Sequence, residues 1–247
     1  MITVDFSRLN IKSGYRVLDI GCGPGRHTCA AIRFRQVTVV GVDLNLDDIL
    51  EARNRLKFHE ALGEYGGGMW GLSVADAIEL PFKDNFFDLV ICSEMLEHVH
   101  DQKAAVHEII RVLKPGRNLV VSVPRYLPER ICWALSDNYH KTGNGHIRIY
   151  RKKELIGLLE SAGTESWKIH YAHSLHTPYW WLKCLVGPAR EDFRLVNLYH
   201  RLLVWDMMKR PVITCMLEKL LNPLLGKSIV LYLKKEHIKN PDHRCHQ

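Results

Sequence analysis

The chain alternates short, strongly apolar runs with longer stretches in which apolar residues recur at helical spacing. Apolar runs rich in β-branched residues and bounded by turn residues are typical of strands buried on both faces of a sheet. The predicted strands are 17–20, 37–42, 71–75, 87–92 and 118–123, and the helices between them are 28–35, 48–62 and 101–113. Strands that alternate with helices predict an α/β fold with a mostly parallel sheet and helices on both faces.

A glycine-rich turn follows the first predicted strand, where Asp19 precedes glycines at positions 21, 23 and 25. Glycines let the backbone turn sharply and approach a ligand more closely than a Cβ would permit. The N–H groups at the start of the next helix favour an anionic group in the same crevice. However, Arg26 stands where the G-x-G-x-x-G fingerprint of dinucleotide-binding loops requires its third glycine. A carboxylate at Asp19 would repel a pyrophosphate and suits a cationic ligand that carries an amino group.

The segment Val17-Leu-Asp-Ile-Gly-Cys-Gly-Pro-Gly25 resembles the first motif of the class I S-adenosylmethionine (SAM)-dependent methyltransferases. Residues 74–90 resemble the segment of that family that encloses adenine, and 108–116 form another phrase typical of it. Ser93-Glu-Met-Leu-Glu-His-Val99 resembles the post-strand motif of the branch that methylates small molecules, quinone precursors among them. The resemblance covers 15–123 almost without interruption. It implies a Rossmann-like, seven-stranded, mostly parallel sheet and SAM as the cofactor.

Several residues are candidates for holding the cofactor. Asp43 lies about twenty residues beyond the glycine turn, the distance at which a βαβ unit places an acid against ribose hydroxyls. The alternative is that Asp43 caps the helix after Asn45, and one residue can serve both roles. By the resemblance, Asp76 accepts a hydrogen bond from the exocyclic amino group of adenine, and the backbone N–H of Ala77 reaches a ring nitrogen. The predicted cofactor-binding residues are Asp19, Gly21, Cys22, Gly23, Gly25, Asp43, Leu44, Asp76, Ala77, Ser93 and Glu94.

Two histidines are candidates for a general base. His98 follows the fourth strand, one turn into a helix, where a packed or capping histidine is the commoner case. His146 lies in Gly145-His-Ile-Arg-Ile-Tyr150, a phrase that resembles relatives in which this loop borders the substrate, and imidazole titrates near neutral pH. The alternative is that His146 only fixes the loop that enters the next helix, 152–162. The predicted substrate contacts are Tyr126, Tyr150 and Trp180.

The last two predicted strands are 167–173 and 228–233, which in the resembling fold form an antiparallel pair joined by a short connection. Here roughly fifty residues intervene, well beyond the usual loop length. Apolar residues at positions 195, 198, 202, 205 and 208 predict amphipathic helices with basic residues off the apolar face. One interpretation is an aromatic and helical cap, a lid that excludes water. The other is an interfacial element across 178–225, with Trp and Tyr at the level of lipid headgroups and basic residues above anionic lipid.

Composition and charge restrict the partners only weakly. The 247 residues are 47% hydrophobic, enough for a full core, and carry a formal charge of +7. That charge permits nucleic acid or an anionic membrane as a partner, but it also suits simple solubility. The 7 cysteines are dispersed without a C-x-x-C pair and indicate reduced thiols. No apolar signal core and no apolar run near the ~20 residues of a membrane span are present, so we expect a cytoplasmic protein, with peripheral membrane attachment left open.

Clustered histidines raise the question of a metal. His170, His173 and His176 recur at every third residue, but on a strand this spacing scatters side chains over both faces. His237, His243, Cys245 and His246 lie in a tail, 236–247, that we expect to be disordered. Because neither set has the ligand spacing of a structural zinc site, the sequence predicts no metal.

The sequence therefore predicts a single methyltransferase domain. It comprises a SAM-binding core (1–123), a substrate-side loop (124–150), a helical insert or lid (174–227) and the tail. The methyl group of SAM is already electrophilic, so the protein mainly has to place the acceptor in line and at close range. We expect a small, hydrophobic acceptor methylated at O, C or N.

Two other classes of function stay open. An RNA-modifying methyltransferase would use the same core and the positive charge, but no separate basic domain and no Asn-Pro-Pro-Tyr-like phrase after the fourth strand is present. A catalytically silent module would bind a partner through the Trp-rich insert, yet it would not need the glycine loop and its three acids. The sequence does not specify the oligomeric state.

Overall fold

The computed structural model describes residues 1–141, 145–190 and 192–237, and in this part of the chain a seven-stranded sheet runs in the order β3-β2-β1-β4-β5-β7-β6. The strands are β1 (Arg16–Ile20), β2 (Thr38–Asp43), β3 (Met69–Val74), β4 (Phe87–Ser93), β5 (Leu113–Pro124), β6 (Thr164–Ala172) and β7 (Ser228–Lys235). The pairs from β3 to β5 are parallel, whereas β7 pairs antiparallel with both β5 and β6. The prediction of a seven-stranded, mostly parallel sheet is confirmed.

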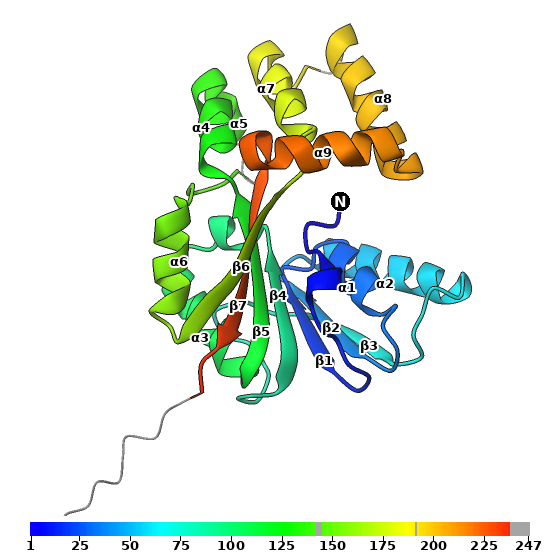
Figure 1. Ribbon diagram of the computed structural model, residues 1–247, viewed down its shortest axis with the longest axis vertical. Helices are drawn as coiled ribbons and strands as arrows, with labels where there is room; N and C mark the ends of the chain where they lie inside the picture. Colours follow the sequence, from blue (N-terminus) through cyan, green and yellow to red (C-terminus); the bar gives the residue numbers. More distant parts are fainter. Residues whose placement is uncertain (142–144, 191, 238–247) are drawn as a thin grey trace, which may run out of the picture.

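Helices cover both faces and one end of this sheet (Figure 1). They are α1 (Arg26–Ala31), α2 (Leu46–Ala61), α3 (Gln102–Val112), α4 (Tyr126–Leu135), α5 (Asp137–Lys141), α6 (Lys152–Glu160), α7 (His176–Val186), α8 (Arg194–Lys209) and α9 (Val212–Leu225), with 3₁₀ turns η1 (Phe6–Arg8) and η2 (Leu96–His98). In Figure 1, α1 and α2 lie on one side of the sheet and α3 and α6 on the other. Helices α4, α5 and α7 to α9 stand over the end of the sheet where the parallel strands finish.

The core forms two apolar layers because successive side chains of a strand point to opposite faces. Along β1, Val17 packs with Ile32 and Leu56 from the α1–α2 side. Its neighbour Leu18 packs with Ile109 and Leu155 from the α3–α6 side. This double burial explains why the predicted strands are continuous apolar runs rather than alternating ones.

The cap consists of α7, α8 and α9, which lie between β6 and β7 in the chain. One hydrogen bond ties it to α4, and two more hold its helices together. Trp181 Nε1 donates to the Pro128 carbonyl of α4 at 3.0 Å, and Thr177 Oγ1 donates to the Leu225 carbonyl at 2.6 Å. Ser174 N donates to Asn222 Oδ1 at 3.0 Å, so the start of α7 is joined to the end of α9.

The segment 124–150, expected as a loop, contains the helices α4 and α5. The reason is visible in α4, whose Pro128, Glu129 and Cys132 form a buried stripe at helical spacing. Pro128 also falls in the first turn, where its missing N–H costs nothing. The predicted glycine loop begins at His140, and its positions 142–144 lie outside the described residues, as does 238–247 of the predicted tail.

Candidate cofactor and acceptor site

The candidate site lies at the carboxyl ends of β1, β2 and β4. The sheet order changes direction between β1 and β4, because β2 and β3 follow β1 on one side and β4 follows it on the other. In open α/β sheets, ligands bind outside the carboxyl ends of the strands at such a switch point. The glycine turn after β1 lies at this point.

The three glycines of the turn differ in what surrounds them. All have positive φ angles, +65° at Gly21, +49° at Gly23 and +79° at Gly25, and residues that carry a Cβ rarely adopt such angles. A Cβ at Gly21 would lie 2.5 Å from Met95 Cγ, and one at Gly25 would lie 2.9 Å from Ala52 Cβ. A Cβ at Gly23 would meet nothing within 4 Å. Gly21 and Gly25 therefore allow close packing, while Gly23 borders open space in which a ligand fits.

Asp43 ends β2 and holds the glycine turn. Its Oδ2 accepts a hydrogen bond from the backbone N–H of Gly23 at 2.8 Å, and its Oδ1 accepts one from Asn45 N at 2.9 Å. The N-cap of α2 is Asn45, whose Oδ1 accepts from Asp47 N at 2.9 Å. The alternative role considered for Asp43, capping this helix, therefore falls to Asn45.

Asp19 lies beneath the turn rather than at its surface. Its side chain is buried, with 1% of the residue exposed, and its Oδ2 accepts a hydrogen bond from Thr28 Oγ1 at 2.6 Å. Burial raises the pKa of Asp19 to about 7, the Thr28 hydrogen bonds oppose that rise, and the negative charge of Asp43 adds to it. The carboxyl thus fixes the start of α1 against the end of β1.

The predicted adenine segment lies next to Asp43. Ala75 N donates to the Asp43 carbonyl at 3.0 Å, which continues the β2–β3 pairing by one residue. Asp76 Oδ1 accepts a hydrogen bond from Ile78 N at 3.1 Å, and Ala77 is buried. Leu44 is 66% exposed beside them. Cys22 is buried, and its N–H donates to the Val42 carbonyl at 3.0 Å.

A chain of hydrogen bonds links the ends of β4 and β5. The hydroxyls of Ser93 and Ser122 lie 2.7 Å apart, and Ser122 Oγ donates to Glu94 Oε1 at 2.9 Å. Glu94 has a positive φ of +53°, a conformation that redirects the chain sharply after β4. Burial raises the pKa of Glu94, while Ser122 and the charge of Lys227 oppose the rise. Ser93 and Glu94, both predicted to hold the cofactor, thus border the site at the end of β4.

Under the cap, His146 belongs to a charged cluster. Its Nδ1 lies 2.6 Å from Glu129 Oε1, and Glu129 Oε2 lies 3.5 Å from Lys227 Nζ. Lys227 Nζ also lies 5.2 Å from the ring centre of Trp180. Glu129 is 1% exposed; burial acts to raise its pKa, but the hydrogen bonds and charges of His146 and Lys227 hold that pKa below its usual value. A carboxylate that orients a histidine in this way is a common arrangement in proton-transfer sites.

The sequence did not reveal Glu129 and Lys227. Glu129 lies on a helix that the sequence predicted as loop, and Lys227 precedes the last strand without a motif around it. A partial signal existed for the neighbouring acid Glu97, since Glu94, Glu97 and His98 occupy one turn directly after β4.

Glu97 is the most unusual side chain of the site. It is 0% exposed, and neither of its carboxylate oxygens has a hydrogen-bond partner within the described residues. Burial raises the pKa of Glu97 well above its usual value, and the charges of Glu94 and Glu129 add to the effect. The rings of His98 and His146 lie beside it with their centres 5.0 Å apart. Burial and the His146 ring lower the pKa of His98, and a hydrogen bond to the Gly145 backbone opposes them.

The three aromatic residues predicted to contact substrate differ in position. Trp180 lies at the charged cluster, with its ring centre 5.8 Å from that of Tyr139. Tyr150 is 6% exposed, and its hydroxyl donates to Gln102 Oε1 at 2.6 Å, which fixes the start of α3. Tyr126 lies under the guanidinium of Arg151, 5.0 Å from its ring centre. Of these three, only Trp180 thus contacts the charged cluster, through Lys227.

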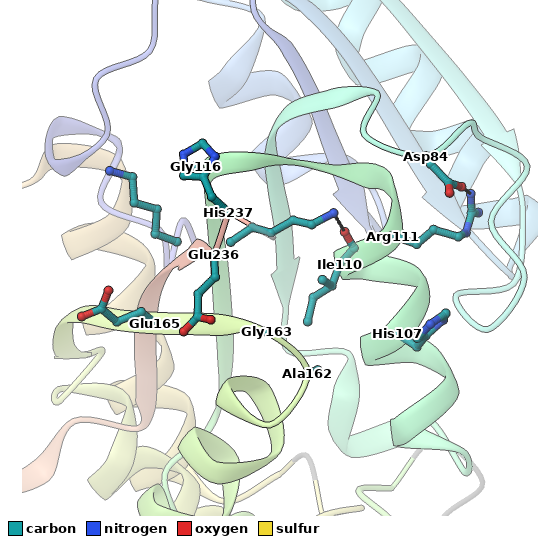
Figure 2. A pocket seen from close by; sticks show the side chains of 12 residues that line it. Asp84, His107, Ile110, Arg111, Gly116, Ala162, Gly163, Glu165, Glu236 and His237 are labelled. Atoms are coloured by element: carbon teal, nitrogen blue, oxygen red, sulfur yellow. Dashed lines mark hydrogen bonds and ion pairs between the residues drawn. The ribbon is translucent and has the colours of Figure 1, made fainter. Parts of the chain in front are cut away.

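A cavity of about 930 Å³ lies at the opposite end of the strands from the candidate site (Figure 2). Asp84, Arg111, Gly116 and Glu236 are among the residues that line it. Asn118 of β5 pairs with Lys234 of β7, so this cavity lies where the parallel strands begin rather than where they end. It is therefore separate from the candidate site.

The histidines spaced by threes divide into two groups. His170 stacks on Tyr232 with ring centres 5.5 Å apart. His173 and His176 have ring centres 5.7 Å apart. A ring nitrogen of each histidine and a carboxylate oxygen of Glu218 all lie within 4.8 Å of one another. Only His170 lies on β6, so the expected scattering along a strand does not apply to His173 and His176, which the turn after β6 brings together.

In this sheet β7 runs antiparallel beside β5, a glycine turn follows β1, and an acid ends β2. This is the arrangement of class I methyltransferases. A family model described as a methyltransferase domain matches residues 3–169. The chain belongs to this methyltransferase-domain family.

Known proteins show the same relationship. Methyltransferase GfsG of Streptomyces halstedii is 32% identical over 117 residues, which cover 47% of this chain and 40% of GfsG. Cycloartenol-C-24-methyltransferase 1 of Oryza sativa subsp. japonica is 31% identical over 150 residues, 60% of this chain and 39% of that protein. The chain thus spans about two fifths of the length of these curated relatives. The solved structure of a SAM-dependent methyltransferase of Methanosarcina mazei superposes with a TM-score of 0.63 at 17% identity, over 96% of this chain and 99% of that one.

The residues at the switch point fit SAM, the cofactor that this family implies. The open space beside Gly23 accommodates a ligand against the backbone, and Asp43 stands next to it with carboxylate oxygens that can accept from ribose hydroxyls. Asp76 and the buried Ala77 follow at the next strand end, where an adenine ring finds a polar edge and apolar neighbours.

Proposed function

We propose that the chain transfers the methyl group of SAM to a small, hydrophobic acceptor. The observation that carries the proposal is the Asp43 carboxylate, fixed by Gly23 N at 2.8 Å and Asn45 N at 2.9 Å beside the open space of the glycine turn. A carboxylate that is already oriented binds ribose hydroxyls without further ordering, which favours affinity.

Each part of the site has a role in this proposal. When bound, SAM supplies an electrophilic methyl group on a sulfonium. Asp43 and the glycine turn bind the ribose side, Asp76 and Ala77 the adenine, and Ser93 and Glu94 border the methyl-transfer centre. Asp19 supports the turn from below through Thr28. His146, oriented by Glu129 at 2.6 Å, is the candidate for handling the acceptor's proton.

The cap and the relatives support a hydrophobic acceptor. Trp180 offers an aromatic surface beside the charged cluster, and the helices of the cap exclude water from it. One relative, by its name, is a cycloartenol-C-24-methyltransferase. In this proposal, the atom of the substrate that receives the methyl group is O, C or N.

RNA modification and a silent interaction module are the competing functions. The first predicts a steep dependence of binding on salt with RNA as the ligand. The second predicts no turnover of SAM with any acceptor. The paired acids and histidine under the cap favour an enzyme, because a module that only binds a partner gains nothing from them.

The proposed function is tested first by calorimetry of SAM binding to the wild type and to Asp43→Ala. Asp43 makes charge-assisted hydrogen bonds, so its loss is expected to weaken SAM about 10- to 100-fold. Asp47→Ala, which changes an exposed acid of the next helix turn, is the matched control and should bind SAM as the wild type does. An unfolding curve for each variant shows that the fold is intact. Absence of SAM binding to the wild type would refute the methyltransferase function.

We further propose that the cap touches an anionic membrane surface. None of the helices in the described ranges is long and apolar enough to cross a bilayer. On α9 only Thr214 is buried, while Val212, Ile213 and Leu220 are 76%, 73% and 72% exposed. Contiguous exposed apolar surface of this kind is rare on soluble proteins and marks interaction sites. The exposed bases Lys209, Arg210 and Lys219 beside it favour anionic lipid as the partner.

This arrangement keeps both interpretations of the insert. The inner face of α7 packs on α4 and that of α8 packs on α7, with Cys184, Val196 and Leu203 buried. The outer apolar residues of α8 and α9 are left for the membrane. Free thiols at the described cysteines, five of them buried, support the expected cytoplasmic location.

A further inference from the structure

Two segments distant in the chain meet beneath the cap. One is the turn after β4 that carries Glu97 and His98, and the other is the stretch from His146 into α6. Ile147 N donates to the Glu97 carbonyl at 3.1 Å, and Arg148 Nη2 donates to the His100 carbonyl at 2.9 Å. These two contacts, one from the backbone and one from the Arg148 side chain, hold Glu97, His98 and His146 on a fixed frame.

The three side chains converge on one point. A carboxylate oxygen of Glu97 and a ring nitrogen from each histidine all lie within 4.8 Å of one another. Around a bound ion with bonds near 2.1 Å, neighbouring ligand atoms lie roughly 3 to 4 Å apart. Small rotations of the side chains therefore suffice to enclose an ion.

The surroundings of Glu97 favour a cationic partner over a free carboxylate. A carboxylate that is 0% exposed and has both oxygens without a partner among the described residues is strongly unfavourable as an isolated charge. Glu94 and Glu129 add negative charge nearby, whereas Lys227 Nζ is directed to Glu129 at 3.5 Å and not to Glu97. A cation among these side chains would satisfy Glu97.

The surroundings of His146 also match those of a metal ligand. Ligating histidines usually donate their second ring nitrogen to a carboxylate, which fixes the ring and the tautomer. Glu129 Oε1 holds His146 Nδ1 in this way at 2.6 Å and leaves Nε2 for an ion.

We propose that Glu97, His98 and His146 bind one divalent first-row transition-metal ion. Two imidazoles and a carboxylate suit manganese, iron, cobalt or zinc better than magnesium or calcium, which prefer oxygen ligands alone. The proposal departs from our expectation from the sequence that the chain holds no metal. That expectation considered only histidines near each other in the sequence, whereas His98 and His146 are brought together by the fold.

A metal here would deepen the proposed function, on which its catalytic role rests. Met95, adjacent to this turn, packs against Gly21 of the cofactor loop, so the ion would lie beside the methyl-transfer centre. With three protein ligands, positions stay open for an acceptor hydroxyl, whose pKa a metal lowers. The hydroxyl proton leaves to solvent, the oxygen lone pair bonds to the methyl carbon, and the carbon–sulfur bond breaks to give the methyl ether and S-adenosylhomocysteine. In that case His146 would hold the ion rather than take the proton itself, and the acceptor class would be an alcohol or phenol.

A second group, His173, His176 and Glu218, is the competing location within the described residues. It is the weaker one because His173 Nε2 already lies 3.2 Å from Thr3 Oγ1. Its carboxylate, Glu218, is also only partly buried, whereas Glu97 is fully buried. It provides the matched control for the experiment.

The test is a titration of the EDTA-treated full chain with Mn²⁺ alone, followed by electron paramagnetic resonance and by the unfolding temperature. We expect one Mn²⁺ per chain and an unfolding temperature that rises with Mn²⁺ concentration. Glu97→Gln keeps the shape of the side chain and should weaken Mn²⁺ at least about 100-fold, without lowering the stability of the metal-free protein. His176→Gln should bind Mn²⁺ as the wild type does.

Each other outcome decides a different question. Wild-type affinity in Glu97→Gln, or binding lost in His176→Gln alone, would overturn the assigned site. No Mn²⁺ binding by the wild type would overturn the inference, and SAM binding measured in the same preparation would leave the proposed function intact. Metal binding without SAM binding would support the metal site and refute the proposed function.

Discussion

Among single residues, His27 joins the start of the chain to the first helix. Its Nε2 accepts hydrogen bonds from Thr3 N at 3.1 Å and Val4 N at 3.4 Å. A ring nitrogen that accepts from two backbone N–H groups must be unprotonated. Burial lowers the pKa of His27 to about 4, and the positive charges of the first amine and Arg26 add to the effect.

This histidine should make stability depend on pH. Its pKa is about 4 in the folded state and ordinarily near 6.5, so the unfolded chain binds the proton first as pH falls. The contribution is complete above pH ~6.5 and is lost between that pH and ~4, on the order of 3 kcal/mol. Urea unfolding at several pH values is the measurement. His27→Gln keeps an acceptor oxygen but does not titrate, and it should flatten part of this slope; an unchanged slope would show that His27 is not responsible.

The sequence allowed prediction of single residues where a motif has a fixed geometry. The glycine turn and Asp43 were found because a ligand crevice after a strand restricts which residues fit there. Glu129 and Lys227 could not be found, since their roles depend on three-dimensional neighbours from α4 and from the chain before β7. Tyr150 shows the converse, because an aromatic residue in a suggestive phrase spends its hydroxyl on Gln102.

Among the elements, α3 fixes the turn that leads into β4. Arg111 near its end donates to Glu108, to Asp84 Oδ1 at 2.7 Å, and to the carbonyls of Phe82 at 2.7 Å and Leu80 at 2.9 Å. Its fork-shaped guanidinium can serve several acceptors at once, which lysine cannot. The turn follows the Asp76–Ala77 segment proposed to hold adenine, so α3 supports the site from a distance.

Replacing Arg111 by Ala should therefore act on both stability and cofactor affinity. We expect a loss of about 2 kcal/mol in the free energy of unfolding, because two backbone carbonyls lose their side-chain donor and Glu108 loses its ion pair with Arg111. SAM affinity should fall by a few fold, as the turn becomes less ordered. Urea unfolding and calorimetry measure the two effects. Arg53→Ala, on the exposed side of α2, should stay within about 0.5 kcal/mol of the wild type. Equal stability of both variants would contradict the role assigned to Arg111.

Elements were predictable where their periodicity is strong. The buried strands and α2, α3 and α9 come from patterns that burial on both faces or on one stripe dictates. Helices α4 and α5 were missed because a segment with three aromatics and several polar residues has no clear period, and its helix forms by packing Pro128 and Cys132 beneath α7. Tertiary contacts there override a weak local preference.

For the whole molecule, charge and apolar surface meet on the cap. Residues 174–227 hold eight Lys and Arg against four Asp and Glu, so the insert carries more than half of the chain's formal charge of +7. The outer face of α8 and α9 exposes Met208, Val212 and Met216 next to these bases, at 78%, 76% and 66%. The same end of the molecule covers the candidate site (Figure 1). A hydrophobic acceptor dissolved in a bilayer could then enter the site without crossing water.

The membrane proposal predicts binding that depends both on the basic charge and on the exposed apolar surface of the cap. Vesicles with anionic lipid should sediment with the protein, vesicles of neutral lipid much less, and salt should weaken binding because it screens the charges. Lys209→Glu with Arg210→Glu should reduce affinity by about tenfold or more, since each basic residue near the surface contributes about 1 kcal/mol. Ile213→Ser with Leu220→Ser should reduce it even in low salt, because it removes apolar area rather than charge. Lys152→Glu with Lys153→Glu on α6, and Phe58→Ser on α2, are the matched controls and should bind as the wild type does. If the α8–α9 variants bind like these controls, the cap is a lid alone, and its apolar face has a partner other than lipid.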